Sequence, residues 1–271
     1  MSVDLILVPQ GAEYAAVTNG LRTSIINPPQ VVAIPVGIHA LHYLEHSPLI
    51  RELGQISPWQ NKNILVMGLG GSLRAQANIG DIVIPKSLDF AICGTSPKAD
   101  SRDQGEDDSN LKPIKDRTSM KQSLSHCWLE PSFTRALQET LINGLAEAPA
   151  PPKIIVSHGV TSNRIIITAQ EKQRLGHIYD ADVVDMEGVH ICDFFHQKGA
   201  RVGIVRAISD GCATDIPDLN VALDEAGNLN FKAMIWQFLR RPKAAANLIQ
   251  GSLKGLKCLE LISGFCASLT L

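Results

Sequence analysis

The stretch VVDMEGVHICDFFHQKGARVGIVRAISDGC, residues Val183 to Cys212, contains the most informative pattern in the chain. Its apolar ends are typical of two buried strands, and the segment between them is typical of a helix. Glu187 stands at the predicted helix start, and Arg206, Ser209 and Asp210 follow where the second strand ends. Charged residues at the exits of two buried strands indicate a small-molecule site at the edge of an α/β sheet.

Outward from this stretch, strand and helix patterns alternate along the chain. This alternation predicts an α/β fold, with a mixed or mostly parallel sheet covered by helices on both faces. The predicted strands are Leu5–Pro9, Val31–Val36, Ile64–Met67, Asp81–Pro85, Lys153–Ser157, Asp182–Met186 and Val202–Ala207. The predicted helices are Gly11–Leu21, His39–Leu53, Phe133–Leu145, Glu187–Lys198, Asn230–Leu239 and Pro242–Leu261.

Length and composition are consistent with one domain that spans residues 1–271. Hydrophobic residues make up 45% of the chain, enough to fill a sizeable core. Lys and Arg number 25 against 27 Asp and Glu, giving a net charge of −2. The absence of a basic excess argues against nucleic acid as the main partner.

Two segments stand apart from the alternating pattern. Residues 94–122 are polar and dense in charge, which predicts a long insertion, either a solvated loop or a substrate lid. Residues 229–263 are predicted to form a helical C-terminal extension, and Pro242 suits the first turn of its second helix.

Targeting and cysteine patterns favour a cytoplasmic protein. The first apolar run follows no basic segment, so we expect a core strand there and not a signal peptide. No segment approaches the length of a membrane span. The six cysteines include no CxxC pair, which favours reduced thiols over a zinc or redox site.

Four groups of residues are suited to chemistry, and each also has a structural explanation. Glu13 follows the first strand, but acids are common in the first turn of a helix. The glycines of Gly68–Ser72 permit close approach to a ligand, or simply a tight turn. Asp185 and Glu187 could act in a site or could cap a helix. Arg206 could serve a site or form a surface ion pair with Asp210.

Other familiar site patterns are missing from the sequence. His42 and His46 have the spacing of metal ligands on a helix, but no third ligand accompanies them. There is no dinucleotide or P-loop fingerprint and no GxSxG elbow. We therefore expect neither a metal nor a cofactor.

Taken together in chain order, the four groups resemble one enzyme superfamily. Glu13, the segment GLGGSLRAQANIGDIVIP (Gly68–Pro85), VVDMEG (Val183–Gly188) and VRAISD (Val205–Asp210) are similar to the nucleoside phosphorylases and nucleosidases. The nearest resemblance is to the methylthioadenosine/S-adenosylhomocysteine nucleosidase branch. It implies a single α/β domain with a barrel-like sheet, hydrolysis of the N-glycosidic bond of a 5′-substituted adenosine with release of adenine, and a role in purine salvage.

The resemblance also implies roles for particular residues. Asp210 would protonate or hydrogen-bond N7 of the adenine leaving group, with Ser209 supporting it. Glu13 would activate the attacking water, and Arg206 would orient the water and the carboxylates. An acid near the purine and carboxylates near the sugar suit a reaction that leaves an oxocarbenium-like sugar. Substrate contacts are expected from Gly70, Gly71, Ile166, Met186, Glu187 and Ser209.

Three departures from the nucleosidase pattern stand out. Leu69 occupies a position that is usually serine in the glycine segment. Thr161–Ile166 replaces a stretch that usually carries an aromatic residue for stacking on adenine. The tail is similar to that of hopanoid-associated phosphorylase-like proteins, which suggests a bulkier 5′-substituent and a wider pocket.

Two other functions remain open at this stage. One is a phosphate-dependent phosphorylase, for which Arg74 behind the glycines could bind phosphate. The other is a non-catalytic nucleoside-binding protein. By analogy with the family we expect a homodimer or higher homo-oligomer.

Overall fold

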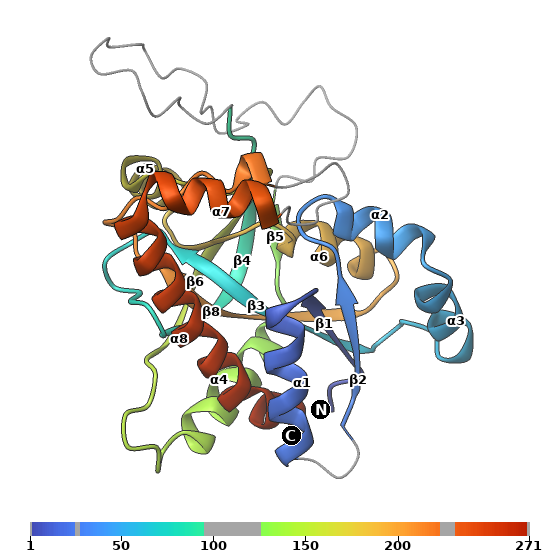
Figure 1. Cartoon of the computed structure of the whole chain (residues 1–271). Helices are drawn as coiled ribbons and strands as arrows, with labels where there is room; N and C mark the ends of the chain where they lie inside the picture. The colour runs from blue at the N-terminus through green and yellow to red at the C-terminus, as the bar shows by residue number, and fades with distance from the viewer. Residues whose placement is uncertain (1, 25–27, 95–125, 223–230, 270–271) are drawn as a thin grey trace.

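The computed structural model describes residues 2–24, 28–94, 126–222 and 231–269. Within these residues, eight strands form one mixed sheet flanked by helices (Figure 1). The strands are β1 (Leu5–Pro9), β2 (Gln30–Ile34), β3 (Asn63–Ser72), β4 (Ile82–Ala91), β5 (His126–Trp128), β6 (Ile154–Ser162), β7 (Ala181–Asp185) and β8 (Arg201–Asp210). The helices are α1 (Ala12–Ser24), α2 (His39–His46), α3 (Pro48–Ile56), α4 (Pro131–Gly144), α5 (Ala169–Tyr179), α6 (Gly188–His196), the short 3₁₀ helix η1 (Asn220–Ala222), α7 (Phe231–Arg240) and α8 (Pro242–Ala267).

Five of these strands close into a ring. β3 pairs with β7 and β8, β4 pairs with β6 and β8, and β6 pairs with β7. β1 and β2 extend the sheet beyond β3 in parallel, and β5 adds an antiparallel edge to β4. The prediction of a single α/β domain around a mixed, barrel-like sheet is confirmed.

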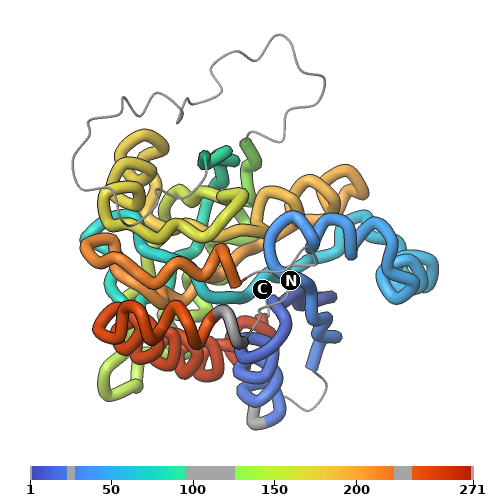
Figure 2. The backbone as a smooth tube through the Cα atoms, turned by 45° about the horizontal axis from the view of Figure 1, so that its top comes forward, coloured from blue at the N-terminus to red at the C-terminus, as the bar shows by residue number. Residues whose placement is uncertain are grey.

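The first strand shows how helices on both faces produce an apolar run without polar alternation. Leu5 and Leu7 point into a core with residues of α2, α3 and α6. Ile6 and Val8 point the other way, into a core with residues of α1, α4 and α8. In Figure 2 the red α8 runs beside the blue α1, so the first and last helices together cover one face of the sheet.

The pairing of β3 with β8 brings the glycine segment beside the RAISD motif. Gly68 lies opposite Arg206 and Gly71 lies opposite Asp210, with a bulge between Gly70 and Gly71. The glycines therefore belong to a strand, and the simple alternative of a tight turn is wrong. Glycine at position 70 allows β3 to lie close to β7, because a Cβ there would be only 2.7 Å from Cγ2 of Val183.

One predicted helix is broken in two. The expected helix His39–Leu53 ends at His46, and α3 begins anew at Pro48. Proline lacks the backbone N–H that would continue α2, and Ser47 before it takes an extended conformation. Ser47 then caps α3 by accepting a hydrogen bond from the N–H of Ile50 at 3.5 Å.

Three elements, α5, β5 and the short η1, are absent from the prediction. α5 starts after Thr168, whose hydroxyl accepts a hydrogen bond from the N–H of Glu171 at 3.2 Å. The sequence Thr168-Ala169-Gln170-Glu171 is the capping-box pattern S/T-x-x-E, so this helix start could have been recognised. Residues 95–122 of the predicted insertion lie outside the described residues.

Other boundaries shift in ways that matter for the site. β8 continues to Asp210, so Ser209 and Asp210 lie in the strand and not after it. The predicted C-terminal helices are present as α7 and α8, with α8 reaching Ala267. No helix among the described residues combines the length and apolar character needed to span a bilayer. All six cysteines are buried free thiols.

Candidate active site

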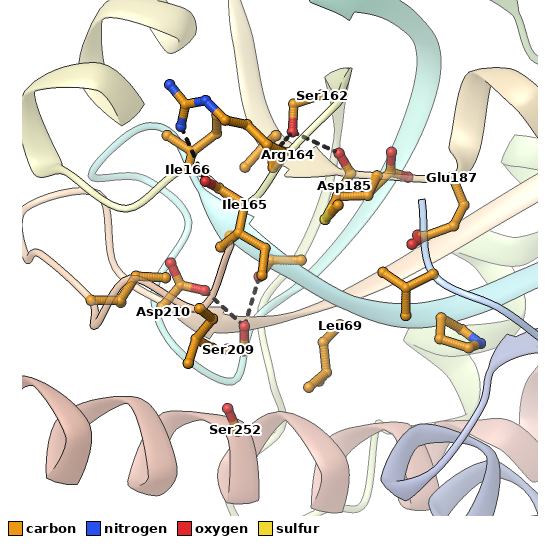
Figure 3. A pocket seen from close by; sticks show the side chains of 18 of the residues that line it. Leu69, Ser162, Arg164, Ile165, Ile166, Asp185, Glu187, Ser209, Asp210 and Ser252 are labelled. Carbon is orange, nitrogen blue, oxygen red and sulfur yellow. Dashed lines mark hydrogen bonds between the residues drawn. The ribbon is translucent and has the colours of Figure 1, made fainter. Parts of the chain in front are cut away.

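A cavity of about 260 Å³ opens between β3, β7, β8 and α8. Its walls include eight of the nine residues that the sequence predicted for the site: Glu13, Gly70, Gly71, Ile166, Met186, Glu187, Ser209 and Asp210. The ninth, Arg206, is fully buried and contacts two of the carboxylates beside the cavity. In Figure 3, Asp210 and Ser209 lie on the opposite side of the view from Glu187.

Arg206 is held by carboxylates within the protein. Its Nε and Nη2 donate to Oδ2 of Asp185 at 3.0 and 2.6 Å, and Nη2 also reaches Oε2 of Glu187 at 3.5 Å. The proposed surface ion pair between Arg206 and Asp210 is therefore wrong. Asp185 is the residue that sequence reasoning undervalued, because a helix cap explained it equally well.

Asp185 combines both roles that the sequence left open. Its Oδ1 accepts from the hydroxyl of Thr161 at 2.6 Å and from the N–H of Gly188 at 3.2 Å, the first residue of α6. Its other oxygen binds Arg206. One carboxylate thus anchors a helix start and fixes the guanidinium beside the cavity.

Glu13 lies at the start of α1 and reaches across to β3. Its Oε1 accepts a hydrogen bond from the backbone N–H of Leu69 at 2.6 Å. Burial raises the pKa of Glu13 to about 7, with the Glu187 carboxylate adding to the rise while the Leu69 N–H and Arg206 oppose it. A carboxylate with a pKa near neutrality can take up and release a proton at physiological pH.

A donor and an acceptor meet near Gly68. Nη1 of Arg206 is buried and has no hydrogen-bond partner among the described residues. A Cβ placed on Gly68 would collide with this Nη1 and would lie 2.9 Å from Oε1 of Glu13. The absence of a side chain at Gly68 therefore lets a guanidinium N–H without a partner and a carboxylate oxygen both lie close to the strand.

Glu187 precedes α6 but its side chain makes no capping hydrogen bond. Instead, its Oε1 accepts from the N–H of Gly37 at 2.9 Å. Burial raises the pKa of Glu187; Arg206 opposes this and Asp185 adds to it. Gly37 has a φ of +69°, a conformation that glycine adopts without strain, and it places its N–H toward this carboxylate.

At the other end of the cavity, Asp210 is bound on both oxygens. Oδ1 accepts from the Ser209 hydroxyl at 2.8 Å, and Oδ2 accepts from Nζ of Lys172 at 2.5 Å. A Cβ on Gly71 would lie 3.2 Å from Oδ2, so glycine leaves room for the carboxylate. Sequence reasoning missed Lys172 because it missed α5, the helix that carries it.

The segment Thr161–Ile166, which replaces the expected aromatic stretch, is held by hydrogen bonds to η1. Both backbone groups of Ile165 bind the side chain of Asn220, at 2.8 and 2.9 Å. The side chains of Ile165 and Ile166 instead line the cavity (Figure 3). An apolar wall thus stands on the same side as Asp210.

The substitution of leucine at position 69 leaves the site intact. The contact to Glu13 uses the backbone of Leu69 and does not depend on its side chain. The side chain lines the cavity and packs against α8, where a Cβ on Gly255 would lie 2.7 Å from its Cδ2. Leu248 and Ser252 of α8 complete this wall.

Each cation that lines or adjoins the cavity in the described part of the chain has an acidic partner. Arg164 pairs with Glu171 at 2.5 Å, Lys172 with Asp210, and Arg206 with Asp185. Arg74 does not line the cavity and binds Asp180 at 2.6 Å. The described residues also contain no group of three or more metal-ligating side chains that could hold a metal ion.

The family model of the phosphorylase superfamily matches residues 10–240. The chain belongs to the phosphorylase superfamily. The match begins directly after β1 and spans α1 to α7, so it includes every predicted site residue. No curated protein sequence matches the chain significantly.

Solved structures of superfamily members share the fold at low sequence identity. The methylthioadenosine/S-adenosylhomocysteine nucleosidase of Neisseria meningitidis, in complex with methylthio-immucillin-A, has a TM-score of 0.60 at 13% identity, covering 99% of this chain and 100% of its own. A putative methylthioadenosine nucleosidase of Weissella paramesenteroides has a TM-score of 0.54 at 16% identity, with 100% of both chains covered. Futalosine hydrolase of Helicobacter pylori has a TM-score of 0.54 at 15% identity, covering 92% and 96%.

Proposed function

We propose that this protein hydrolyses the N-glycosidic bond of a 5′-substituted adenosine and releases adenine. The observation that carries the proposal is the division of the cavity into two ends. Asp210 and Ser209 offer a carboxylate and a hydroxyl at one end. Glu13, Glu187 and the buried Arg206 lie at the other. A single glycosidic bond placed between them would meet the groups that its cleavage requires.

The base end would bind and protonate the purine. Ile165 and Ile166 would pack on the flat ring, and Asp210 would face N7 and the 6-amino group. As the C–N bond breaks, its electron pair moves onto the purine. A proton delivered at N7 makes the purine a better leaving group, a contribution of about 10²–10⁴-fold for a well-placed acid.

The sugar end would stabilise the cation and supply the water. Glu187 would accept hydrogen bonds from the ribose hydroxyls, with Met186 packing on the sugar. The carboxylates of Glu13 and Glu187 lie where positive charge develops on the sugar. Water held between Nη1 of Arg206 and Glu13 would lose a proton to Glu13 as it attacks the anomeric carbon.

Water is favoured over phosphate by the charges of the cavity. A phosphate dianion would need cations that are not already neutralised. In the described residues, Arg164, Lys172 and Arg206 each have an acidic partner, and Arg74 binds Asp180 away from the cavity. Glu13 beside the attacking group would also repel phosphate. A storage protein has no need of the unpaired Arg206 N–H next to a carboxylate with a pKa near 7.

The 5′-substituent is expected to be small and apolar. Leu69, Leu219 and Leu248 line the cavity. The two residues of α8 that line it, Leu248 and Ser252, are both uncharged. At about 260 Å³, the cavity lies near the lower end of small-molecule pockets, which span roughly 300–1,000 Å³. We therefore expect methylthioadenosine to be preferred to S-adenosylhomocysteine, and both to bulky lipid-like substituents.

An adenine-release assay tests these statements together. The substrates are methylthioadenosine, S-adenosylhomocysteine, 5′-deoxyadenosine and adenosine, each with and without phosphate. We expect phosphate-independent release, fastest for methylthioadenosine. Asp210→Asn should lower kcat by about 10²–10⁴-fold while changing adenine affinity less than about tenfold. Strict phosphate dependence would contradict hydrolysis, and wild-type turnover by Asp210→Asn would remove Asp210 from its role.

A further inference from the structure

Lys172 is fully buried beside the base end of the cavity and does not line it. Its Nζ donates to Oδ2 of Asp210 at 2.5 Å, to the carbonyl of Gly211 at 3.1 Å and to the carbonyl of Thr214 at 3.3 Å. The three N–H groups of the ammonium thus have three acceptors, and only Asp210 among them is charged. Nothing in the superfamily pattern quoted above includes this lysine.

The position of Lys172 is an unfavourable one for a cation. Burial removes the hydration of the ammonium, which is strongly unfavourable in the absence of a partner. Lys172 is also the fourth residue of α5, in the first turn, where the helix dipole disfavours positive charge. The Asp210 carboxylate compensates for both effects. Anything that neutralises Asp210 therefore leaves the ammonium without its compensating charge.

We propose that Lys172 and Asp210 form one proton-holding pair, in which Lys172 is the positioning residue that supplies the proton delivered through Asp210 to the leaving purine. The proposal rests on the proposed function and deepens it. It explains where the proton comes from when the carboxylate that faces the purine is bound to an ammonium.

The proton transfer balances over one turnover. The Nζ–H bond of Lys172 breaks as an O–H bond forms on Asp210. That O–H bond breaks as N–H forms at N7, while the electron pair of the glycosidic bond passes to the purine. Lys172 is left as a neutral amine, which burial and the helix dipole both favour. Water adds hydroxide to the sugar and its proton goes to Glu13, which returns it to solvent as Lys172 is recharged.

Other charged groups near the pair are themselves engaged. They are Glu171 and Arg164, which bind each other; Asp215, which accepts from the N–H of Ala169; Asp182, which accepts from Gln76; and the Asp185–Arg206 pair across the cavity. Within the described ranges the only cation that lines the cavity is Arg164, which is paired with Glu171. The pH behaviour of the base end is therefore expected to follow Lys172 and Asp210.

The test is the pH profile of kcat/KM for adenine release from methylthioadenosine by Lys172→Met. In the wild type Lys172 supplies the proton to Asp210. In Lys172→Met the carboxyl at position 210 has no ammonium beside it and must take its proton from solvent. We expect Lys172→Met to approach wild-type activity only at acidic pH and to lose about 100-fold at neutral pH, mainly in kcat.

Three further variants sharpen this test. Lys172→Arg keeps the charge but does not release a proton, so it should retain adenine affinity and still lose kcat at neutral pH. It also carries the test if Lys172→Met does not fold. Adding Lys172→Met to Asp210→Asn should cost nothing more, because Lys172 acts through Asp210. Lys254→Met is the matched control, since Lys254 is at the surface and donates to the carbonyl of Ile79.

The outcomes separate the pair from the proposed function. A wild type that releases adenine, with a Lys172→Met profile parallel to its own or full rescue by Lys172→Arg, would overturn the proton-holding pair alone. A wild type that releases no adenine from any of the four nucleosides, with or without phosphate, would overturn the proposed function itself.

Discussion

The two ends of the cavity differ in how their charges are balanced. At the base end one carboxylate, Asp210, faces one ammonium, Lys172. At the sugar end the guanidinium of Arg206 forms ion pairs with Asp185 and Glu187, and the Glu13 carboxylate is close enough to feel its charge. The base end is thus neutral and the sugar end carries excess negative charge when its acids are ionised.

This difference matches what each half of the substrate becomes during cleavage. The purine leaves with extra electron density and needs a proton, which a neutral ion pair can hold. The sugar becomes cationic and is stabilised by excess carboxylate. Burial raises the pKa values of Glu13 and Glu187, and the neighbouring carboxylates at this end raise them further.

The largest effect is expected where Arg206 is removed from the sugar end. Arg206→Met would leave Asp185 and Glu187 buried without their cation, which should lower the free energy of unfolding by about 3–5 kcal/mol. Urea denaturation measures the loss. Lys62→Met, which breaks the half-exposed pair with Asp4, is the control and should cost no more than about 1 kcal/mol. Equal losses in the two variants would contradict the central role of Arg206.

The next largest effect concerns the proton acceptor. Glu13→Gln should lower kcat by about 10²–10⁴-fold, because the amide cannot take the proton of water. The exposed Glu45→Gln on α2 is the control and should retain full activity. In the wild type, kcat/KM should rise with pH through about 7 as Glu13 ionises. A rise at the same pH in Glu13→Gln would show that another group titrates.

The raised pKa of Glu13 also makes the free energy of unfolding fall as pH rises. The folded-state pKa of Glu13 is about 7, above its ordinary value of 4.5, so the folded state binds the proton more tightly. This stabilisation is complete below about pH 4.5 and is lost as pH rises toward 7. Glu13→Gln should therefore flatten the decline of the unfolding free energy in this window.

A smaller effect is expected from the close fit at the base end. A Cβ on Gly71 would lie 3.1 Å from Cγ1 of Val184 and 3.2 Å from Oδ2 of Asp210. Gly71→Ala should displace the carboxylate by a few tenths of an ångström and lower kcat/KM by roughly tenfold. In Gly94→Ala the added methyl meets nothing within 4 Å, so this control should match the wild type. Full activity in Gly71→Ala would show that the fit is looser than the geometry indicates.

The sequence predicted the sheet and most of the candidate residues that line the cavity because these features are local. The run Leu5–Pro9 is apolar throughout, which identifies a strand buried on both faces. Glu13, Glu187 and Asp210 stand at strand ends, where sites form in α/β folds.

What the sequence could not predict depends on pairing across the sheet. The ion pair that the sequence allows for Arg206 is with its near neighbour Asp210, whereas strand pairing brings Arg206 to Asp185 on β7. The glycines of Gly68–Gly71 were interpreted as a possible turn, because only the register with β8 shows that they lie in a strand. Lys172 was not predicted because α5 was not predicted. The polar sequence of this helix gives no sign that Lys172 is buried.

Product analysis in phosphate buffer tests the central claim most directly. Purified protein is incubated with methylthioadenosine and inorganic phosphate, and the sugar product is identified by mass spectrometry, with Asp210→Asn as the blank. If water attacks between Glu13 and Arg206, the product is free methylthioribose together with adenine. Methylthioribose 1-phosphate as the main product would contradict the claim.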